Sequence, residues 1–510
     1  MNELLMGIDV GTTSTKAVVT DLSGETLCIT TAEYPLLFPK IGWAEQKPQD
    51  LLDGVLSAMK EAAEKLGDKA KDVCALSFST QRDTVIPLDE NDQPLWNAIT
   101  WMDTRATKEC EKLKTDMGED RFYASTGVPV STIWTGAFIL WLRENAPEVF
   151  DKSAMFSLVH DYLLCALGAK EHVLDTTNAC ETMMYDFVRG VWDKEILDYM
   201  GISEEKLPKL VEPGTVVGAL SAEIAERTGL PEGLLLVSGG GDQQCAMLGS
   251  GAIALGDGEV GIGTAANIMA ATKTPLFDEQ KKLICHRSLV PNGFLMEGAM
   301  LSTGKLIEWL RDLFYSGVKN PFKVMDAEVE RDSKPGAGGM FLTPHFEGSA
   351  SPHWDEDARG ICVGLTLGTK RADVCRAVME GVALEIKKNL ILMEKMGVKL
   401  KRMVVTGGAG NSPVWLQIIA DVLNLPVVTL QNKQCAAMGG VILAGVGSGR
   451  LATFEEGVNT MVRVKETYLP RAEYRELYDS LLDLDNRSFA ALQGAGVYRD
   501  QLALKQKLQD

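Results

Sequence analysis

The feature that most constrains the fold of this chain is a strand-turn-strand segment that occurs twice. The first copy, MGIDVGTTSTKAVVTDL, places Gly11, Thr12 and Thr13 between two β-rich runs. The second copy, GEVGIGTAANIMAAT, places Gly263 and Thr264 252 residues after Gly11 and Thr12, in a chain of 510 residues. Such turns offer free N–H groups and small hydroxyls, which suit phosphate oxygens. The repeat predicts two related halves that each present a hairpin to a shared cleft.

The segment after the first turn distinguishes a hairpin from a P-loop. A P-loop turn leads into a helix, whereas GTTST continues into KAVVTDL, a polar SGE turn and TLCITTAEY. These β-branched runs predict a hairpin tip, with Lys16 adding positive charge beside it. Apolar residues at helical spacing predict a helix over residues 48–66. Helical and strand patterns continue along the chain, which predicts a mixed α/β fold.

Composition excludes several classes of protein. With 51 basic and 70 acidic side chains, the net charge is −19, which argues against nucleic acid or an anionic membrane as a partner. The ten cysteines contain no CxxC pair, which is typical of reduced thiols rather than a zinc site. No apolar stretch approaches the roughly 20 residues of a membrane-spanning helix, and the first residues lack the pattern of a signal peptide. We therefore expect a cytoplasmic protein.

Two carboxylates lie near glycines at the ends of predicted strands. Asp9 precedes the first turn and could hold Mg²⁺, which favours one or two carboxylates together with phosphate oxygens. A surface carboxylate or a turn cap is the alternative. Asp242 follows three glycines in SGGGDQQ, ahead of a predicted helix. It is either the N-cap of that helix or a general base for a hydroxyl that attacks the γ-phosphate of ATP.

Polar residues that suit a sugar follow another predicted strand. In TQRD, Gln81, Arg82 and Asp83 offer an amide, a guanidinium and a carboxylate in a row. A polyol is bound by many directed hydrogen bonds, although a solvated turn explains the same residues. Trp101 either walls the pocket or belongs to the core. Near the end of the chain, TGGAGNSPVW follows a strand and opens a helix, at a position that suits a nucleotide.

Six segments, in their order along the chain, resemble the FGGY carbohydrate kinases, which include glycerol kinases, xylulokinases and gluconokinases. They are IDVGTTSTK, TQRDTVIPLD, NAITWMDTRA, GGGDQQ, GIGTAAN and TGGAGNSPVWLQIIADVLNLPV, and RGICVGLTLGTKRADVCRAVMEGV fits the C-terminal signature of the family. The resemblance covers about residues 4 to 470. It implies a two-lobed, actin-like (ribonuclease H-like) α/β fold with ATP and Mg²⁺ in the interdomain cleft. We expect lobes at residues 1–247 and 248–510.

The resemblance also implies roles for individual residues. Asp242 would be the general base, and Asp9 would lie near the metal. The expected acceptor-binding residues are Gln81, Arg82, Asp83, Trp101 and Gln243. The expected ATP-binding residues are Gly11, Thr12, Thr13, Lys16, Gly263, Thr264, Gly304, Gly408 and Asn411.

The expected activity is ATP-dependent phosphorylation of a terminal hydroxyl of a small sugar. The segment PHFEGSASPHWDEDARG is most similar to xylulokinases, which favours a ketopentose such as xylulose. Since Gln81-Arg82-Asp83 is similar to the Gln-Arg-Glu of glycerol kinases, glycerol or another polyol or sugar acid is the alternative. A rival from another class is an actin-like ATPase that switches conformation without a sugar acceptor. The oligomeric state stays open, with a homodimer as one option.

Overall fold

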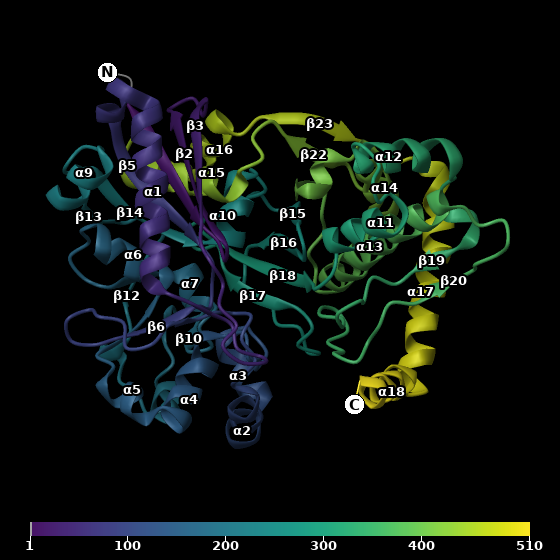
Figure 1. Cartoon of the computed structure of the whole chain (residues 1–510), viewed down its shortest axis with the longest axis horizontal. Helices are drawn as coiled ribbons and strands as arrows, with labels where there is room; N and C mark the ends of the chain where they lie inside the picture. The colour runs from purple at the N-terminus through teal and green to yellow at the C-terminus, as the bar shows by residue number, and fades with distance from the viewer. Residues whose placement is uncertain (1–2, 510) are drawn as a thin grey trace.

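A computed structural model describes residues 3–509 and contains two large β-sheets, one in each half of the chain (Figure 1). The first sheet has six strands in the order β13 (Val216–Ala219), β14 (Leu235–Gly241), β5 (Val73–Thr80), β1 (Leu4–Val10), β2 (Ser14–Asp21) and β3 (Thr26–Glu33). The second has seven in the order β17 (Ile284–Arg287), β18 (Phe294–Met300), β16 (Ala266–Thr272), β15 (Asp257–Ile262), β21 (Arg402–Gly407), β22 (Val427–Leu430) and β23 (Val464–Tyr468). The predicted mixed α/β fold is confirmed.

The two Gly-Thr turns occupy equivalent places in the two sheets. β1 is antiparallel to β2 and parallel to β5, and β15 is likewise antiparallel to β16 and parallel to β21. Asp9 pairs with Lys16 across the first hairpin, and Ile262 pairs with Ala266 across the second. β14 and β22 then each add a further parallel strand. Both segments are hairpins, as predicted, and the shared strand order supports two related halves.

The first helix follows directly from its sequence. α1 (Pro48–Leu66) has the predicted bounds, and its buried residues Leu51, Val55 and Met59 recur at helical spacing. They belong to the core between this helix and the first sheet. The proline lies in the first turn, where a missing N–H breaks no helical hydrogen bond. Gly67 ends the helix with φ 56°, a conformation that favours glycine.

The rest of the first half comprises small sheets and short helices. A four-stranded sheet contains β4 (Glu45–Gln46), β7 (Ala98–Ile99), β6 (Val85–Leu88) and β8 (Met155–Leu158). Two short sheets pair β9 (Val173–Asp175) with β12 (Lys209–Val211), and β10 (Tyr185–Asp186) with β11 (Val191–Trp192). The helices are α2 (Thr107–Met117), α3 (Glu119–Thr126), α4 (Thr135–Asn145), α5 (Pro147–Lys152), α6 (Val159–Leu167), α7 (Thr176–Cys180), α8 (Lys194–Met200) and α9 (Ala222–Thr228).

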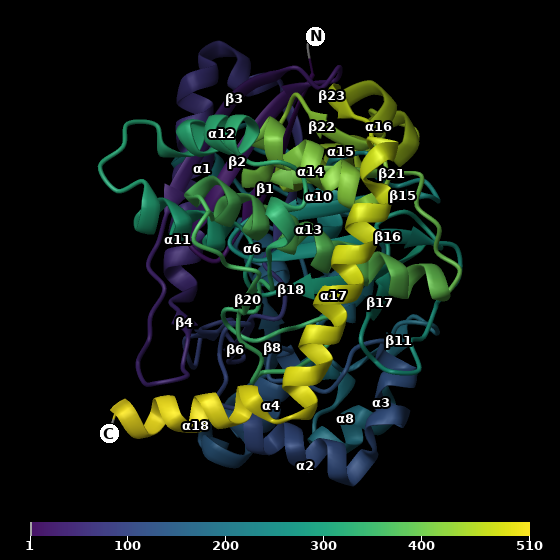
Figure 2. The same cartoon turned by 90° about the vertical axis from the view of Figure 1, so that its right-hand side faces the viewer.

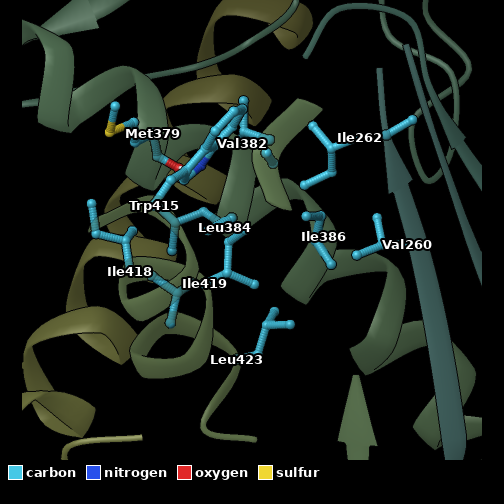
Figure 3. Close-up of a cluster of buried hydrophobic side chains, with 14 of the residues drawn as sticks. Val260, Ile262, Met379, Val382, Leu384, Ile386, Trp415, Ile418, Ile419 and Leu423 are labelled. Carbon is cyan, nitrogen blue, oxygen red and sulfur yellow. The ribbon is translucent and has the colours of Figure 1, made fainter. Parts of the chain in front are cut away.

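Helices of the second half build a separate core around the second sheet. Figure 3 shows part of it, where Met379 and Trp415 lie among aliphatic side chains. The elements are α11 (Gly304–Phe314), α12 (Pro321–Asp332), α13 (Arg371–Lys395), α14 (Pro413–Leu423) and the short pair β19 (Phe341–Leu342) and β20 (Cys362–Val363). The C-terminal helices α17 (Arg475–Gly494) and α18 (Val497–Gln509) follow, and α18 projects from the body of the molecule (Figure 2). Across residues 3–509, no helix is long and apolar enough to cross a membrane.

One helix of the second half packs on the first sheet. α15 (Cys435–Gly447), followed by α16 (Phe454–Met461), lies against α10 (Asp242–Gly249) and against β1 and β5 (Figure 1). Glycines allow this close approach: a Cβ on Gly439 would lie 2.1 Å from the carbonyl oxygen of Cys245. The predicted boundary between residues 247 and 248 falls within α10, which packs against α15. The division at 247 stays a prediction.

Candidate active site

The first strand ends near a carboxylate that faces the next parallel strand. Asp9 is half-buried in β1, and the Ser79 hydroxyl of β5 donates a hydrogen bond to its Oδ1 at 2.9 Å. Lys16 is its neighbour across the hairpin. Burial raises the pKa of Asp9, while the Ser79 hydroxyl and the Lys16 charge oppose the rise. A carboxylate beside a Gly-Thr turn fits Mg²⁺, which takes its other ligands from phosphate oxygens and water.

Asp242 begins α10 directly after β14. The three glycines belong to the strand, and Gly241 is the N-cap of the helix, so the N-cap alternative for Asp242 is wrong. Its Oδ1 accepts a hydrogen bond from the Gln243 N–H at 2.7 Å and lies 3.5 Å from Nε of Arg82. Burial raises the pKa of Asp242 to about 6. The positive charge of Arg82 opposes this rise, and the negative charge of Asp9 adds to it. Such a carboxylate is mostly ionised at pH 7 and basic enough to accept a proton.

A buried ion cluster, which the sequence did not predict, surrounds Arg82. Its Nη1 donates hydrogen bonds to Glu181 at 2.7 Å and to Glu297 at 2.9 Å, and its Nη2 donates to the other Glu297 oxygen at 2.9 Å. His286 lies between the carboxylates, with Nδ1 2.9 Å from Glu181 and Nε2 3.2 Å from Glu297. Burial opposes protonation, but the carboxylates raise the pKa of His286 well above its ordinary value. The cluster fixes the guanidinium beside Asp242.

The sequence carries a weak signal for this cluster. Glu181 in NACETMM and Glu297 in FLMEGAM are single acidic residues among mainly uncharged neighbours, and His286 in LICHRSL directly follows three apolar residues. Ionisable side chains are rarely buried unless they are paired, so each one indicates a partner. The partners lie in distant segments, however, and local patterns do not identify them.

The other two predicted acceptor-binding residues of TQRD, Gln81 and Asp83, flank Arg82 in the sequence. Gln81 donates a hydrogen bond from Nε2 to Gln46 at 2.8 Å, and its Oε1 is buried without a partner among the described residues. Asp83 has φ 68°, a left-handed conformation that is uncommon outside glycine and often found at functional sites. Burial and then the charge of Glu181 raise the pKa of Asp83 well above its ordinary value. Because Gln81 and Asp83 are buried, the solvated-turn alternative is wrong.

The first hairpin is tied to the loop that carries Trp101. The Trp101 Nε1–H donates a hydrogen bond to Oγ1 of Thr12 at 3.1 Å, and Gln46 donates to the Thr12 carbonyl at 2.6 Å. The Tyr34 hydroxyl donates to the Gly11 carbonyl at 2.6 Å. Trp101 is 40% exposed, so the core alternative for this residue is wrong. These bonds connect a predicted acceptor-binding residue to the predicted phosphate hairpin.

A pocket of about 570 Å³ collects the predicted ATP-binding residues of the second half. Ile307, Met379 and Trp415 contribute apolar surface, and Figure 3 labels the last two. Ser412 borders the pocket and caps α14 by accepting the Trp415 N–H at 3.1 Å. A pocket that combines apolar walls with polar side chains, here including Glu308, Lys323 and Asp326, is typical of small-molecule sites. The predicted residues that line it are Gly263, Thr264, Gly304, Gly408 and Asn411.

The second hairpin is held by the start of α11. The Gly304 N–H donates to the Gly263 carbonyl at 2.8 Å, and the Thr303 N–H donates to the Thr264 carbonyl at 3.0 Å. A Cβ on Gly304 would lie 2.3 Å from the Gly263 oxygen, so a larger residue would displace the turn. Gly263 and Thr264 themselves are exposed at the pocket. The turn is therefore fixed from behind while its tip stays accessible.

The acceptor-side residues and the pocket approach each other at the start of α10. Oε1 of Gln243 lies 3.9 Å from the position of a Cβ on Gly261, two residues before Gly263. The lining of the pocket comes from the second half of the chain alone. Thr13 is exposed and borders a separate hollow beside Tyr34. The predicted ATP-binding residues of the first half, Gly11, Thr12, Thr13 and Lys16, therefore do not line this pocket.

Comparison with known proteins identifies relatives over nearly the whole chain. Residues 4–249 match the N-terminal domain, and residues 259–448 the C-terminal domain, of the FGGY family of carbohydrate kinases. Xylulose kinase of Bacillus subtilis (strain 168) is 31% identical over 480 residues, which cover 94% of this chain and 95% of that protein. Glycerol kinase of Chloroflexus aggregans (strain MD-66 / DSM 9485) is 32% identical over 470 residues, with 89% and 92% covered. The crystal structure of gluconate kinase from Lactobacillus acidophilus has a TM-score of 0.90 at 26% identity, over 96% of this chain and 98% of that one.

Proposed function

The chain belongs to the FGGY family of carbohydrate kinases, ATP-dependent phosphotransferases with a two-lobed actin-like fold, and we propose that its acceptor is a ketopentose such as xylulose. The observation that carries the proposed site is Asp242, a carboxylate with a pKa of about 6 held beside Arg82. The proposed lobes are residues 1–247 and 248–510, with the reaction taking place in the cleft between them.

Asp242 is the proposed general base. Its carboxylate would accept the proton of the terminal hydroxyl as the oxygen attacks the γ-phosphate of ATP. Arg82 keeps it in place at 3.5 Å and favours its ionised form. Gln81, Asp83, Trp101 and Gln243 are the further acceptor-binding residues in this proposal. Their amide, carboxyl and indole groups suit the hydroxyls of a small open-chain sugar.

The two hairpins are proposed to hold the phosphates of one ATP molecule. Asp9 is the residue proposed to hold Mg²⁺, an ion that neutralises β- and γ-phosphate charge when bound. The free N–H groups and hydroxyls of the turns, together with Lys16, would bind the remaining phosphate oxygens. The residues assigned to this role are Gly11, Thr12, Thr13, Lys16, Gly263 and Thr264.

The adenosine is proposed to occupy the pocket of about 570 Å³ in the second half. Gly408 and Asn411 follow the carboxyl end of β21, where nucleotides bind in open α/β sheets. Gly304 would allow the nucleotide to approach the backbone. The apolar side chains of Met379 and Trp415 would cover part of the base.

Turnover with a panel of acceptors tests the function. Purified protein with ATP and Mg²⁺ is assayed for ADP release with D-xylulose, L-xylulose, D-ribulose, glycerol or erythritol. We expect ADP release to depend on the acceptor, with the highest kcat/KM for a ketopentose. A preference for glycerol would favour the polyol alternative. ADP release at the same rate without any acceptor would contradict the proposal and support a conformational ATPase.

A further inference from the structure

The hydrogen bonds of Arg82 restrict what it can offer to an acceptor. A guanidinium has five N–H donors. Nη1 uses both of its hydrogens on Glu181 and Glu297, Nη2 uses one on Glu297, and Nε faces Asp242 at 3.5 Å. The second Nη2 hydrogen and the Nε hydrogen remain, and Nε faces the Asp242 carboxylate. They can bind a hydroxyl, but the end-on pair of Nη1 and Nη2 is engaged with Glu297, and the Nε side is turned to Asp242.

The charges around Arg82 lead to the same conclusion. Arg82 and His286 are the cations of the cluster, and Glu181, Glu297 and ionised Asp242 are its anions. Glu181 is fully buried and Glu297 is 2% exposed, so water screens their charges little. Within residues 3–509, Arg82 is the cation that forms an ion pair with Asp242. A negatively charged acceptor would therefore meet an excess of negative charge at the proposed base.

We propose that Glu181 and Glu297 are specificity-determining residues that restrict the acceptor to uncharged sugars and polyols and reject sugar acids. The inference rests on the proposed function, because it assumes that the acceptor binds beside Asp242. Both carboxylates act through Arg82, as positioning residues that occupy its donors and cancel its charge. The buried Oε1 of Gln81 and Oδ1 of Asp83, which lack partners in the described structure, suit the hydroxyl groups of a neutral acceptor.

Glu181 is the better residue to test. Glu297 binds Arg82 through two parallel hydrogen bonds, so its substitution would also release the guanidinium. Glu181 accepts one hydrogen bond from Arg82 and one from the Gln244 amide at 3.1 Å, and it lies 2.9 Å from Nδ1 of His286. Glu181→Gln keeps the size of the side chain and removes its charge, while Glu181→Asp keeps the charge. Glu380→Gln is the matched control, because Glu380 is a 2% exposed carboxylate in α13 that accepts bonds from Tyr478 and the Gly336 N–H.

The test compares acceptors that differ mainly in charge. The pairs are glycerol and glycerate, xylitol and xylonate, and glucitol and gluconate, each assayed for kcat, KM and direct binding. In the wild type we expect kcat/KM to favour the neutral member by about 10²-fold or more, since like charges in a buried site are strongly disfavoured. In Glu181→Gln, the ratio of kcat/KM for the neutral acceptor to kcat/KM for the sugar acid should fall about tenfold, mainly because the KM for the acid decreases. Glu181→Asp and Glu380→Gln should keep the wild-type ratio.

Two results would overturn the inference while leaving kinase activity intact. One is a wild type that uses a sugar acid as well as its neutral partner. The other is an unchanged ratio in a folded Glu181→Gln variant; if that variant does not fold, the wild-type comparison decides alone. A neutral acceptor other than a ketopentose would contradict the proposed substrate but support this inference. No turnover with any acceptor would count against both.

Discussion

Asp242 is the residue on which the proposed chemistry depends, and its neighbours set its charge. Burial favours the protonated carboxyl, Arg82 opposes this, and the negative charge of Asp9 adds to it. The outcome is a pKa of about 6, above the ordinary aspartate value of 3.8. The carboxylate therefore stays mostly ionised at pH 7 and accepts a proton more readily than an exposed aspartate would.

The pH dependence of kcat/KM follows from this pKa. A general base must be deprotonated, so activity is present above the pKa and is lost as the pH falls through it. We expect kcat/KM to be level above about pH 7 and to fall about tenfold per pH unit below about pH 6. Steady-state kinetics between pH 5 and 8 at saturating ATP would measure this pH dependence.

Asp242→Asn is the control, and this substitution should lower kcat by roughly 10²-fold or more with little change in ATP affinity. Near-wild-type activity in Asp242→Asn would contradict the assignment.

The sequence predicts the role of some site residues but not of others. Asp9, Arg82 and Asp242 each lie at or next to a strand end, and the strand pattern of the sequence is enough to locate them. Glu181 and Glu297 have no such local pattern. Their role depends on a contact with Arg82 across 99 and 215 residues of chain, which only the tertiary fold determines.

At the scale of elements, the contact between α10 and α15 supports the site, because Asp242 is the first residue of α10. The two helices meet through glycines on both sides. A Cβ on Gly249 would lie 1.9 Å from the Cys435 carbonyl oxygen, and one on Gly439 would lie 2.1 Å from that of Cys245. A side chain at either position would force α10 and α15 apart, and a shift of α10 would move Asp242.

Gly439→Ala should therefore destabilise the protein. Since the added methyl group meets backbone on the facing helix, we expect the free energy of unfolding to fall by roughly 1–3 kcal/mol. Urea denaturation followed by circular dichroism would measure it. Gly494→Ala in α17 is the control, because nothing lies within 4 Å of a Cβ there, and it should have little effect or stabilise slightly. Equal stability of Gly439→Ala and the wild type would show that this contact is not tight.

The sequence predicts those helices and strands whose position is set by neighbouring residues in the chain. α1 has the predicted bounds because its apolar spacing and its proline are local signals, and both hairpins follow from β-branched runs around a Gly-Thr turn. The return of α15 to the first sheet was not predicted. Its sequence, CAAMGGVILAGVG, indicates a buried helix but does not indicate which sheet covers it.

In the whole molecule, each half contains one large sheet that carries a Gly-Thr hairpin. The interlock of α15 with the first sheet and the cluster of Arg82, Glu181, His286 and Glu297 both cross between the halves. The repeated Gly-Thr turn predicted this duplicated plan from sequence. The relative position of the halves depends on these long-range contacts, which have no counterpart in local sequence.

In the proposed reaction, both hairpins hold a single ATP whose γ-phosphate faces Asp242. The most direct measurement is a crystal structure of the protein with a non-hydrolysable ATP analogue, Mg²⁺ and an acceptor. We expect one nucleotide with its base in the pocket beside Trp415, its phosphates in contact with Thr12 and Thr264, and the acceptor hydroxyl within hydrogen-bond distance of Asp242. A nucleotide whose phosphates contact only the second hairpin, with Asp242 away from the acceptor, would contradict this arrangement.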